Sequence, residues 1–392
     1  MMTSERVKCC LVIESGTDVR LVEGVADRFD VTILARRIPG GREINHPPTR
    51  PVRVLIGTSN RIGFALFAFW NVFLNRKNAA VFVVQGYGLA ALATNLACRM
   101  TGSRSLMLIC SPVEAYYSCR KQFPTGGSPY SSMAFVALRI LARVNGIVGQ
   151  RYVVLSEYLA AVVKSHGTRR SVTVIPVYGV DTRRFSPPDE SKAALRAAIG
   201  LPAFGALVLF SSRIAPEKDS ETLLAAMKLL IDSGRELWIL HRSGGHRRFL
   251  SYAEALGIGG RVIATDAVHP HADLPRDIQA SDLCVQASRE EGLGFSPLEA
   301  LACEVPVVAT AVGGLVETII DGDTGWTYPV GNAQALAACV AAALDHPVES
   351  RRRAANGRRR VLAKYDSRLV FAQFAHLLAP AVSEPISPPQ TG

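Results

Sequence analysis

The sequence predicts an α/β protein made of two domains, each built on a parallel sheet. The chain has 392 residues, 48% of them hydrophobic, which is enough to bury two cores. Apolar runs alternate with helical patterns in two series, one starting near residue 8 and one at Ala206, as strands and helices do in parallel sheets. Pro187 and Pro188, with the charged residues after them, indicate a linker. We therefore expect one domain over residues 1–187 and a second over residues 188–365.

Charge and cysteine content narrow the class of partner and the compartment. The formal net charge of +11 favours acidic partners, namely nucleotide diphosphates, anionic lipid surfaces or nucleic acid. Nothing in the sequence resembles a recognition helix or a stacking aromatic motif, so we expect no nucleic-acid binding. The eight cysteines include no Cys-x-x-Cys pair and the amino terminus lacks a signal-peptide pattern. These features are typical of a cytoplasmic protein with reduced thiols.

The first series opens as strand, turn, helix and strand. Lys8 to Glu14 is an apolar run, Ser15 to Asp18 forms a turn, a helical pattern runs through Phe29, and Val31 to Leu34 is apolar again. Ligands bind at the carboxyl ends of strands in such sheets, so the turn that contains Gly16 is a candidate edge of a cleft. Three more strands are expected, over Val52–Ile56, Ala80–Val84 and Ser105–Cys110.

An aromatic segment between two of these strands fits either of two environments. Ile62 to Leu74 is apolar and is bracketed by Arg61 and by Arg76 and Lys77. It is too short to span a bilayer, which needs about 20 residues. Both an interfacial helix on an anionic membrane and a helix buried against a sheet would have this composition.

The second series carries basic residues after its first strand. Leu207 to Phe210 is expected to be that strand, and the loop after it holds Arg213 and Lys218, five residues apart. Further strands are expected over Trp238–Leu240, Val262–Thr265, Asp282–Val285 and Val305–Thr310. His241, at a strand end, has the position of a structural histidine.

The segment from Glu291 to Glu299 combines two carboxylates, a glycine pair and a helix start. Ser296 is a good N-cap residue and Pro297 suits the first helical position, so we expect a helix from Pro297 to about Cys303. Its amino end would face the glycine loop, where unpaired N–H groups and the helix dipole favour phosphate oxygens. The alternative is a capping box, in which Glu299 only satisfies the N–H of Ser296.

Together these motifs resemble the nucleotide-sugar site of the family 4 retaining glycosyltransferases. The resemblance rests on Glu291-x7-Glu299 with a glycine between, on Glu-Ala-Leu-Ala after it, and on Val-Pro-Val-Val-Ala-Thr from Val305. It implies the GT-B fold, in which two Rossmann-like domains face each other across a cleft. It also implies that a C-terminal helix, here residues 366–380, returns to the first domain. Residues 381–392 have the composition of a disordered tail.

The resemblance assigns roles to individual residues. An arginine and a lysine spaced like Arg213 and Lys218 hold the donor diphosphate in this family, and preplaced cations offset the negative charge that builds there as the sugar bond breaks. Glu291 would lie near the donor sugar and Glu299 would hold the ribose. Val262–Thr265 and the loop at Ala267 and Val268 resemble the part that meets the base. The other implied substrate contacts are Gly16, Leu293, Gly294, Phe295 and Ser296.

No metal and no other cofactor is expected, because two side-chain cations can replace the metal that an Asp-x-Asp motif holds in other glycosyltransferases. Asp321-Gly-Asp323 matches that motif formally. It follows a helical pattern rather than an apolar strand, however, and the family has a turn there.

Several positions depart from the family pattern. The loop after the first strand has Gly16 where two glycines are usual, and no histidine follows the strand that ends at Cys110, where Ser111 and Glu114 stand instead. Tyr178 replaces an asparagine, and Glu304 replaces a glycine at a helix end that favours a left-handed residue. The resemblance is therefore weakest on the acceptor side.

The function that we predict is transfer of a sugar from a nucleotide-diphosphate sugar to an acceptor hydroxyl, with retention of configuration. A polysaccharide or lipid-linked acceptor, and work in the cytoplasm at the inner face of the plasma membrane, are family-level expectations. The alternatives are a non-catalytic, nucleotide-sugar-binding partner subunit and a nucleotide-sugar epimerase. The arginine clusters at residues 351–353 and 358–360 share a helix face, which is either solvated or in contact with an anionic lipid or polyanionic acceptor.

Overall fold

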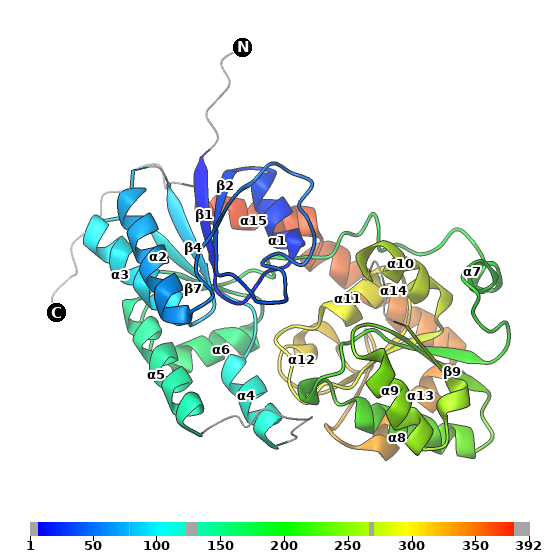
Figure 1. Ribbon diagram of the computed structural model, residues 1–392. Helices are drawn as coiled ribbons and strands as arrows, with labels where there is room; N and C mark the ends of the chain where they lie inside the picture. The colour runs from blue at the N-terminus through cyan, green and yellow to red at the C-terminus, as the bar shows by residue number, and fades with distance from the viewer. Residues whose placement is uncertain (1–6, 78, 123–131, 266–269, 380–392) are drawn as a thin grey trace, which may run out of the picture. The chain divides into compact units, whose positions relative to one another are not determined.

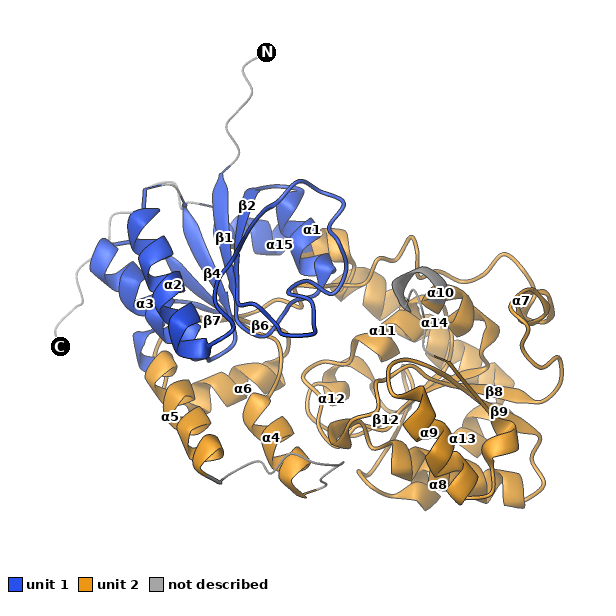
Figure 2. Ribbon diagram, viewed as in Figure 1, with its two compact units in different colours: residues 1–108, 147–152, 371–392 blue, residues 109–146, 153–370 orange. Residues whose placement is uncertain are grey.

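The structure is a computed structural model that describes residues 7–77, 79–122, 132–265 and 270–379 (Figure 1). Its contacts divide the chain into two compact units (Figure 2). Unit 1 comprises residues 1–108, 147–152 and 371–392, and unit 2 comprises residues 109–146 and 153–370. This division groups residues 109–146 with the second series, and the domain boundary at residue 187 stays a prediction. The tail at residues 381–392 lies outside the described residues.

Unit 1 is organised around a parallel sheet. Its strands are β1 (Lys8–Ile13), β2 (Asp30–Ala35), β3 (Arg53–Ile56), β4 (Val81–Gln85) and most of β5 (Ser105–Ile109). Neighbouring strands pair in parallel, β1 lying between β2 and β4. The central strands are buried along nearly their whole length, as parallel strands are when helices cover both faces. The sheet runs in the order β3-β2-β1-β4-β5-β6-β7, where β6 is Tyr152–Val154 and β7 is Val172–Val174.

Three helices connect the strands of unit 1, namely α1 (Val19–Ala26), α2 (Arg61–Leu74) and α3 (Leu89–Thr101). Asp18 and Asn60 cap the amino ends of α1 and α2 through side-chain oxygens. Among the described residues, no helix is both long enough and apolar enough to cross a membrane. The last helix, α15 (Ser367–Leu378), ends in unit 1, and there the ring of Phe371 fills the space beside Gly24 in α1.

Unit 2 holds a second parallel sheet in the order β10-β9-β8-β11-β12-β13. Its strands are β8 (Ala206–Phe210), β9 (Leu237–Arg242), β10 (Val262–Thr265), β11 (Leu283–Gln286), β12 (Val307–Thr310) and β13 (Trp326–Tyr328). One apolar cluster joins these strands to the helices around them, with Phe210, Leu223 and Val285 fully buried. The strands expected from the second series are all present, with each end within two residues of the expected position.

The remaining elements of unit 2 precede, link or follow these strands. Those before β8 are α4 (Val113–Gln122), most of α5 (Ser132–Val148), α6 (Glu157–Ser165) and α7 (Lys192–Ala198). Those after β8 are the 3-10 turns η1 (Pro216–Lys218) and η2 (Gly259–Arg261) and the helices α8 (Ser220–Asp232), α9 (His246–Ala255), α10 (Pro270–Ala280), α11 (Phe295–Ala302), α12 (Leu315–Thr318), α13 (Ala333–Asp345) and α14 (Pro347–Lys364).

The arginine clusters of α14 largely bond within unit 2. Arg352 and Arg353 donate to the carbonyl oxygens of Gly322 and Gly325, and Arg358 donates to that of Ala302. Arg360 donates to the carbonyl oxygen of Glu317. The helix therefore uses these cations to hold neighbouring loops and helix ends, which is a structural role that the sequence did not indicate.

Candidate functional site

The candidate site lies where the strand order of the second sheet reverses. β8 and β11 are neighbours in the sheet, but the chain leaves them toward opposite edges, since β9 and β10 lie beyond β8 while β12 and β13 lie beyond β11. Open parallel sheets bind ligands at this point, beyond the carboxyl ends of the strands. The loop after β8 and the loop after β11 are bonded there, because the backbone N–H of Arg289 donates to the Glu217 carbonyl over 2.9 Å.

The structure brings two of the predicted site residues into direct contact. Lys218, at the end of η1, donates from Nζ to Oε2 of Glu291. Both side chains are largely buried, with exposed fractions of 13% and 11%. The same carboxylate oxygen accepts bonds from Gln286 Nε2 and Ser288 Oγ, at 3.2 and 3.1 Å. Three donors thus bind this one oxygen of the Glu291 carboxylate.

Arg213 joins this group through a second buried carboxylate. Its Nη2 lies 2.8 Å from Oε1 of Glu217, whose side chain has no exposed surface. Arg120, from α4, binds the same carboxylate through Nε at 3.1 Å and Nη2 at 2.6 Å. Burial acts to raise the pKa of Glu217, but the hydrogen bonds from Arg120 and from the backbone, together with the charges of Arg120 and Arg213, outweigh it and lower that pKa below its usual value. Glu217 therefore stays ionised between two guanidinium groups.

Tyr116, one helical turn before Arg120 on α4, donates to Oε1 of Glu291 over 3.4 Å. Burial raises the pKa of Tyr116 well above its ordinary value, and the negative charges of Glu291 and Glu217 raise it further. The phenol therefore stays protonated as a hydrogen-bond donor. Glu217, Tyr116 and Arg120 are members of the site that sequence reasoning missed. The only signal was the place of Glu217 directly before Lys218.

The helix at the glycine loop begins earlier than predicted. α11 starts at Phe295 and Gly294 is its N-cap residue, so the assignment of Ser296 as N-cap and Pro297 as first helical residue is wrong. Gly294 has φ +91°, and a Cβ there would lie 2.5 Å from Cδ2 of Leu315. A glycine that turns the chain into the helix therefore replaces a capping side chain. Ser296 lies inside the first turn, and Glu299 is 4% exposed on the same helix.

The other predicted contacts lie around this helix or in unit 1. Leu293 is buried, and the ring of Phe295 packs edge-on against Tyr178 at 5.4 Å between centroids. Tyr178, the departure from the family asparagine, also donates to Sγ of Cys110 over 3.3 Å. Gly16 follows β1 in unit 1 with φ +82°. Ala267 and Val268 lie outside the described residues.

Other positions flagged by the sequence are structural. His241 is fully buried, with Nδ1 2.9 Å from the Phe210 carbonyl oxygen, and Glu304 adopts the expected left-handed backbone with φ +54°. Oε1 of Glu114 lies 3.2 Å from Nε2 of His166. Asp321 accepts a hydrogen bond from the backbone of Thr327 across the turn before β13.

The Gly313-Gly314 pair packs directly on the loop that carries Glu291. The N–H of Gly314 donates to the Glu291 carbonyl oxygen over 2.9 Å. A Cβ at Gly314 would lie 2.2 Å from the carbonyl oxygen of Gly292, closer than any atom can approach without a backbone shift. The glycine is therefore needed for the position of the loop.

We expect Gly314→Ala to lower the free energy of unfolding by about 1–3 kcal/mol, the usual cost of forcing extra volume into a packed site. Thermal or denaturant unfolding would measure it. The control is Gly260→Ala, because a Cβ at Gly260 would have no neighbour within 4 Å. Gly322→Ala would also add a Cβ in open space, but Gly322 has φ +75° and the substitution would strain the backbone. Equal stability of the Gly314→Ala and Gly260→Ala variants would contradict this account.

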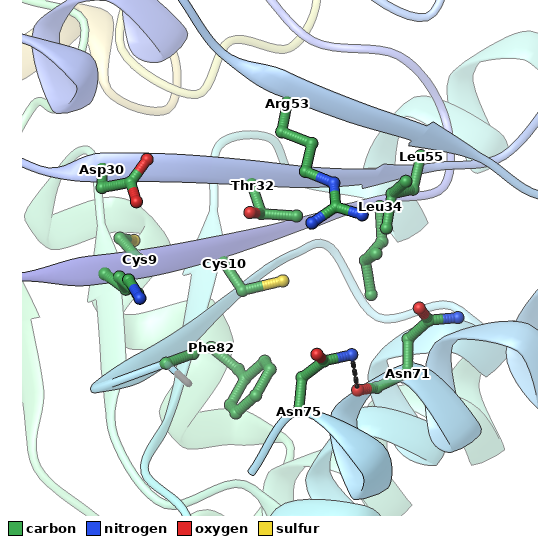
Figure 3. Close-up of a pocket in the computed structure, with 12 residues that line it drawn as sticks. Cys9, Cys10, Asp30, Thr32, Leu34, Arg53, Leu55, Asn71, Asn75 and Phe82 are labelled. Carbon is green, nitrogen blue, oxygen red and sulfur yellow. Dashed lines mark hydrogen bonds between the residues drawn. The ribbon is translucent and has the colours of Figure 1, made fainter. Parts of the chain in front are cut away.

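A pocket of about 370 Å³ in unit 1 is a separate feature (Figure 3). Lys8, Asp30 and Arg53 line it, and these residues begin β1, β2 and β3. The pocket therefore lies at the amino ends of the strands, the opposite end from the loops where such sheets bind ligands. Asn71 of α2 and Asn75, which caps the carboxyl end of that helix, close one side. The side-chain amide of Asn75 donates to the Asn71 backbone carbonyl over 2.9 Å.

Comparison with known families gives a match over much of unit 2. Residues 191–361 match the family model for glycosyl transferases group 1. This range contains Arg213, Lys218, Glu291 and Glu299, so the match covers these four residues of the candidate site.

Individual relatives match over part of their length. A D-inositol 3-phosphate glycosyltransferase of Segniliparus rotundus is 35% identical over 177 residues, which cover 44% of this chain and 37% of that protein. A GDP-mannose-dependent alpha-(1-6)-phosphatidylinositol monomannoside mannosyltransferase of Mycolicibacterium smegmatis is 31% identical over 210 residues, 51% of this chain and 54% of that protein. The matches thus span about a third to a half of these relatives.

Solved structures match nearly the whole chain. Sucrose-phosphate synthase of Thermosynechococcus elongatus has a TM-score of 0.77 at 22% identity, over 95% of this chain and 98% of that one. HepE of Anabaena, solved in complex with UDP-glucose, has a TM-score of 0.72 at 16% identity, over 95% and 99%. The predicted fold class, two parallel-sheet α/β domains of the GT-B type, is confirmed.

Proposed function

We propose that the protein transfers a sugar from a nucleoside-diphosphate sugar to an acceptor hydroxyl, with retention of configuration, as members of glycosyltransferase family 4 do. The observation that carries this proposal is the contact of Lys218 with Glu291 at the reversal point of the second sheet. The names of the relatives, two of which act on inositol-containing acceptors, support a glycolipid or surface polysaccharide as the product. We place the reaction in the cytoplasm.

The site chemistry follows from the two carboxylates and their cations. When the bond between sugar and diphosphate breaks, negative charge grows on the diphosphate, and Lys218 and Arg213 stand ready to balance it. Before a donor binds, Glu291 and Glu217 hold these cations in place, so little reorganisation is needed during the reaction. The amino end of α11 adds backbone N–H groups that favour phosphate oxygens.

Glu299 would bind the ribose of the nucleotide, and its side chain offers only acceptor oxygens to the two ribose hydroxyls. A bond from a neutral hydroxyl to a carboxylate contributes about 1.5–3 kcal/mol, so Glu299→Ala should weaken nucleotide binding by about 10- to 150-fold. Calorimetric titration with UDP, GDP and ADP in metal-free buffer would measure this loss and name the base. One protein compared above uses GDP-mannose and another was solved with UDP-glucose, so GDP and UDP are the leading ligands.

A matched control is Glu221→Ala, which removes an exposed carboxylate from the first turn of α8 in the same unit. It should bind nucleotide like the wild type. Binding of a nucleotide without any sugar transfer or donor hydrolysis would favour the non-catalytic partner subunit, and isomerisation of the donor without acceptor would favour the epimerase. Failure of well-folded protein to bind any of the three nucleotides would overturn the proposal.

A further inference from the structure

α2 has two faces, and only one of them belongs to the core. Phe64, Ala68 and Val72 are fully buried and pack toward the rest of unit 1. The opposite face exposes large apolar side chains at every fourth position, with exposed fractions of 65%, 58%, 56% and 71% for Ile62, Leu66, Trp70 and Leu74. We call these four residues the α2 face. The buried environment considered for this segment thus occurs on one side of the helix, and the other side is exposed.

The composition of the α2 face is wholly apolar. At about 100° per residue, Phe73 and Gly63 fall between the four exposed residues, Phe69 lies just beyond Ile62 at the edge of this face, and no polar side chain falls within it. The ring of Trp70 meets Phe69 and Phe73 edge-on, at 5.7 and 5.9 Å between centroids. The helix packs against α3, which itself exposes Leu96 and Met100. Exposed apolar surface of this extent on a soluble domain marks an interaction site.

The charges around the α2 face select the kind of partner. Residues 44–113 contain seven Lys and Arg residues and no Asp or Glu. The chain has 33 acidic residues among 392, so a stretch of 70 residues with average composition would contain about six. Arg61 lies at the amino end of the helix, and Arg76 and Lys77 follow its carboxyl end. All three residues are exposed. The guanidinium of Arg76 also lies over the ring of Phe73, 5.3 Å from its centroid. The apolar face is thus flanked by cations.

We propose that the α2 face docks on an anionic lipid bilayer, with Ile62, Leu66, Trp70 and Leu74 entering the interface and Arg61, Arg76 and Lys77 contacting headgroup phosphates. Apolar residues on one side of a helix with basic residues at its ends are the features of an interfacial helix. Trp70 suits the level of the headgroups because its ring has a polar N–H edge and an apolar body. Phe69 and Phe73 add apolar bulk, as such side chains do on interfacial helices. An exposed carboxylate in this region would oppose an anionic surface, and residues 44–113 contain no Asp or Glu. Arg61 pairs with Oε1 of Glu14 over 3.5 Å, but the Glu14 side chain is only 8% exposed, whereas that of Arg61 is 68% exposed.

Sedimentation of the full chain with lipid vesicles tests the proposal without donor or acceptor, so the outcome is independent of sugar transfer. We expect binding to vesicles that contain phosphatidylglycerol and at least about 10-fold weaker binding to pure phosphatidylcholine. High salt should weaken the binding because it screens the flanking cations. Brominated lipids should quench fluorescence of the wild type, and Trp70→Phe should bind vesicles but lose most of that quenching.

Two double variants separate the apolar and the charged contributions. Leu66→Ser with Trp70→Ser should reduce vesicle binding at least about 10-fold, because the buried apolar area sets the strength of interfacial binding. Arg76→Ser with Lys77→Ser should reduce it only for anionic vesicles. The matched control is Phe204→Ser with Val348→Ser, which removes two side chains that are 82% and 73% exposed elsewhere in the chain. Unchanged thermal unfolding would show that each variant folds.

Other occupants of the α2 face would give different results. A second copy of the chain would make the wild type dimeric and the Leu66→Ser, Trp70→Ser variant monomeric in light scattering, with no binding to vesicles. Equal binding of the wild type and that variant to anionic vesicles would place the membrane contact elsewhere. A monomeric wild type that binds no vesicle of either composition would also overturn the proposal.

Discussion

Lys218→Ala should lower the turnover of donor by about 100- to 1,000-fold, the usual loss when one preplaced group that stabilises developing charge is removed. The ammonium group is fixed by Glu291 and the Lys218 side chain is only 13% exposed, so water cannot readily supply an equivalent charge at the same point. Arg213 would remain, but it is more exposed, at 57%, and is bonded to Glu217. Lys218 should therefore contribute more to turnover than Arg213 does.

This expectation is tested by measuring consumption of the nucleotide sugar whose base the titration identifies. Lys228→Ala is the control, because Lys228 lies on α8 and pairs with Asp232 at the surface. Lys218→Ala leaves a buried carboxylate with one donor fewer, so unfolding must be compared as well. Turnover close to that of the wild type, in a variant that folds, would remove Lys218 from the mechanism.

The strands and the residues after them could be predicted from the sequence because their signals are local. Continuous apolar runs such as Leu207 to Phe210 indicate strands buried on both faces, and the strands appear where these runs lie. In a parallel sheet, the carboxyl ends of all strands lie along the same edge. The loops with Lys218 and Glu291 follow two strands of one such sheet and therefore meet at that edge, although 73 residues separate them.

Contacts made by α4 could not be predicted in the same way. Tyr116 is 175 residues from Glu291 and Arg120 is 97 residues from Glu217, and no local pattern in α4 signals these partners. The start of α11 was missed for another reason. Ser296 and Pro297 have the right local preferences, but Leu315 packs against Gly294, and this tertiary contact favours a helix that starts two residues earlier than predicted.

Glu291→Gln should separate binding from turnover. The substitution keeps the volume of the side chain, and its carbonyl oxygen can still accept from Gln286, Ser288 or Lys218. It removes a negative charge from a site that must accept a diphosphate, and like charges a few ångström apart repel by several kcal/mol at protein-like dielectric. We therefore expect nucleoside diphosphate to bind at least as tightly as it binds the wild type.

Turnover in the same variant should fall by at least about 100-fold, because a neutral amide cannot stabilise positive charge on the donor sugar as a carboxylate does. Calorimetry with the diphosphate and a donor-consumption assay measure the two effects separately. Glu290→Gln is the matched control, since that neighbouring carboxylate bonds to the Tyr158 hydroxyl at 2.6 Å instead of to Lys218. Equal losses of affinity and turnover would assign Glu291 to the support of Lys218, whereas lost turnover with retained affinity would assign it to the reacting sugar.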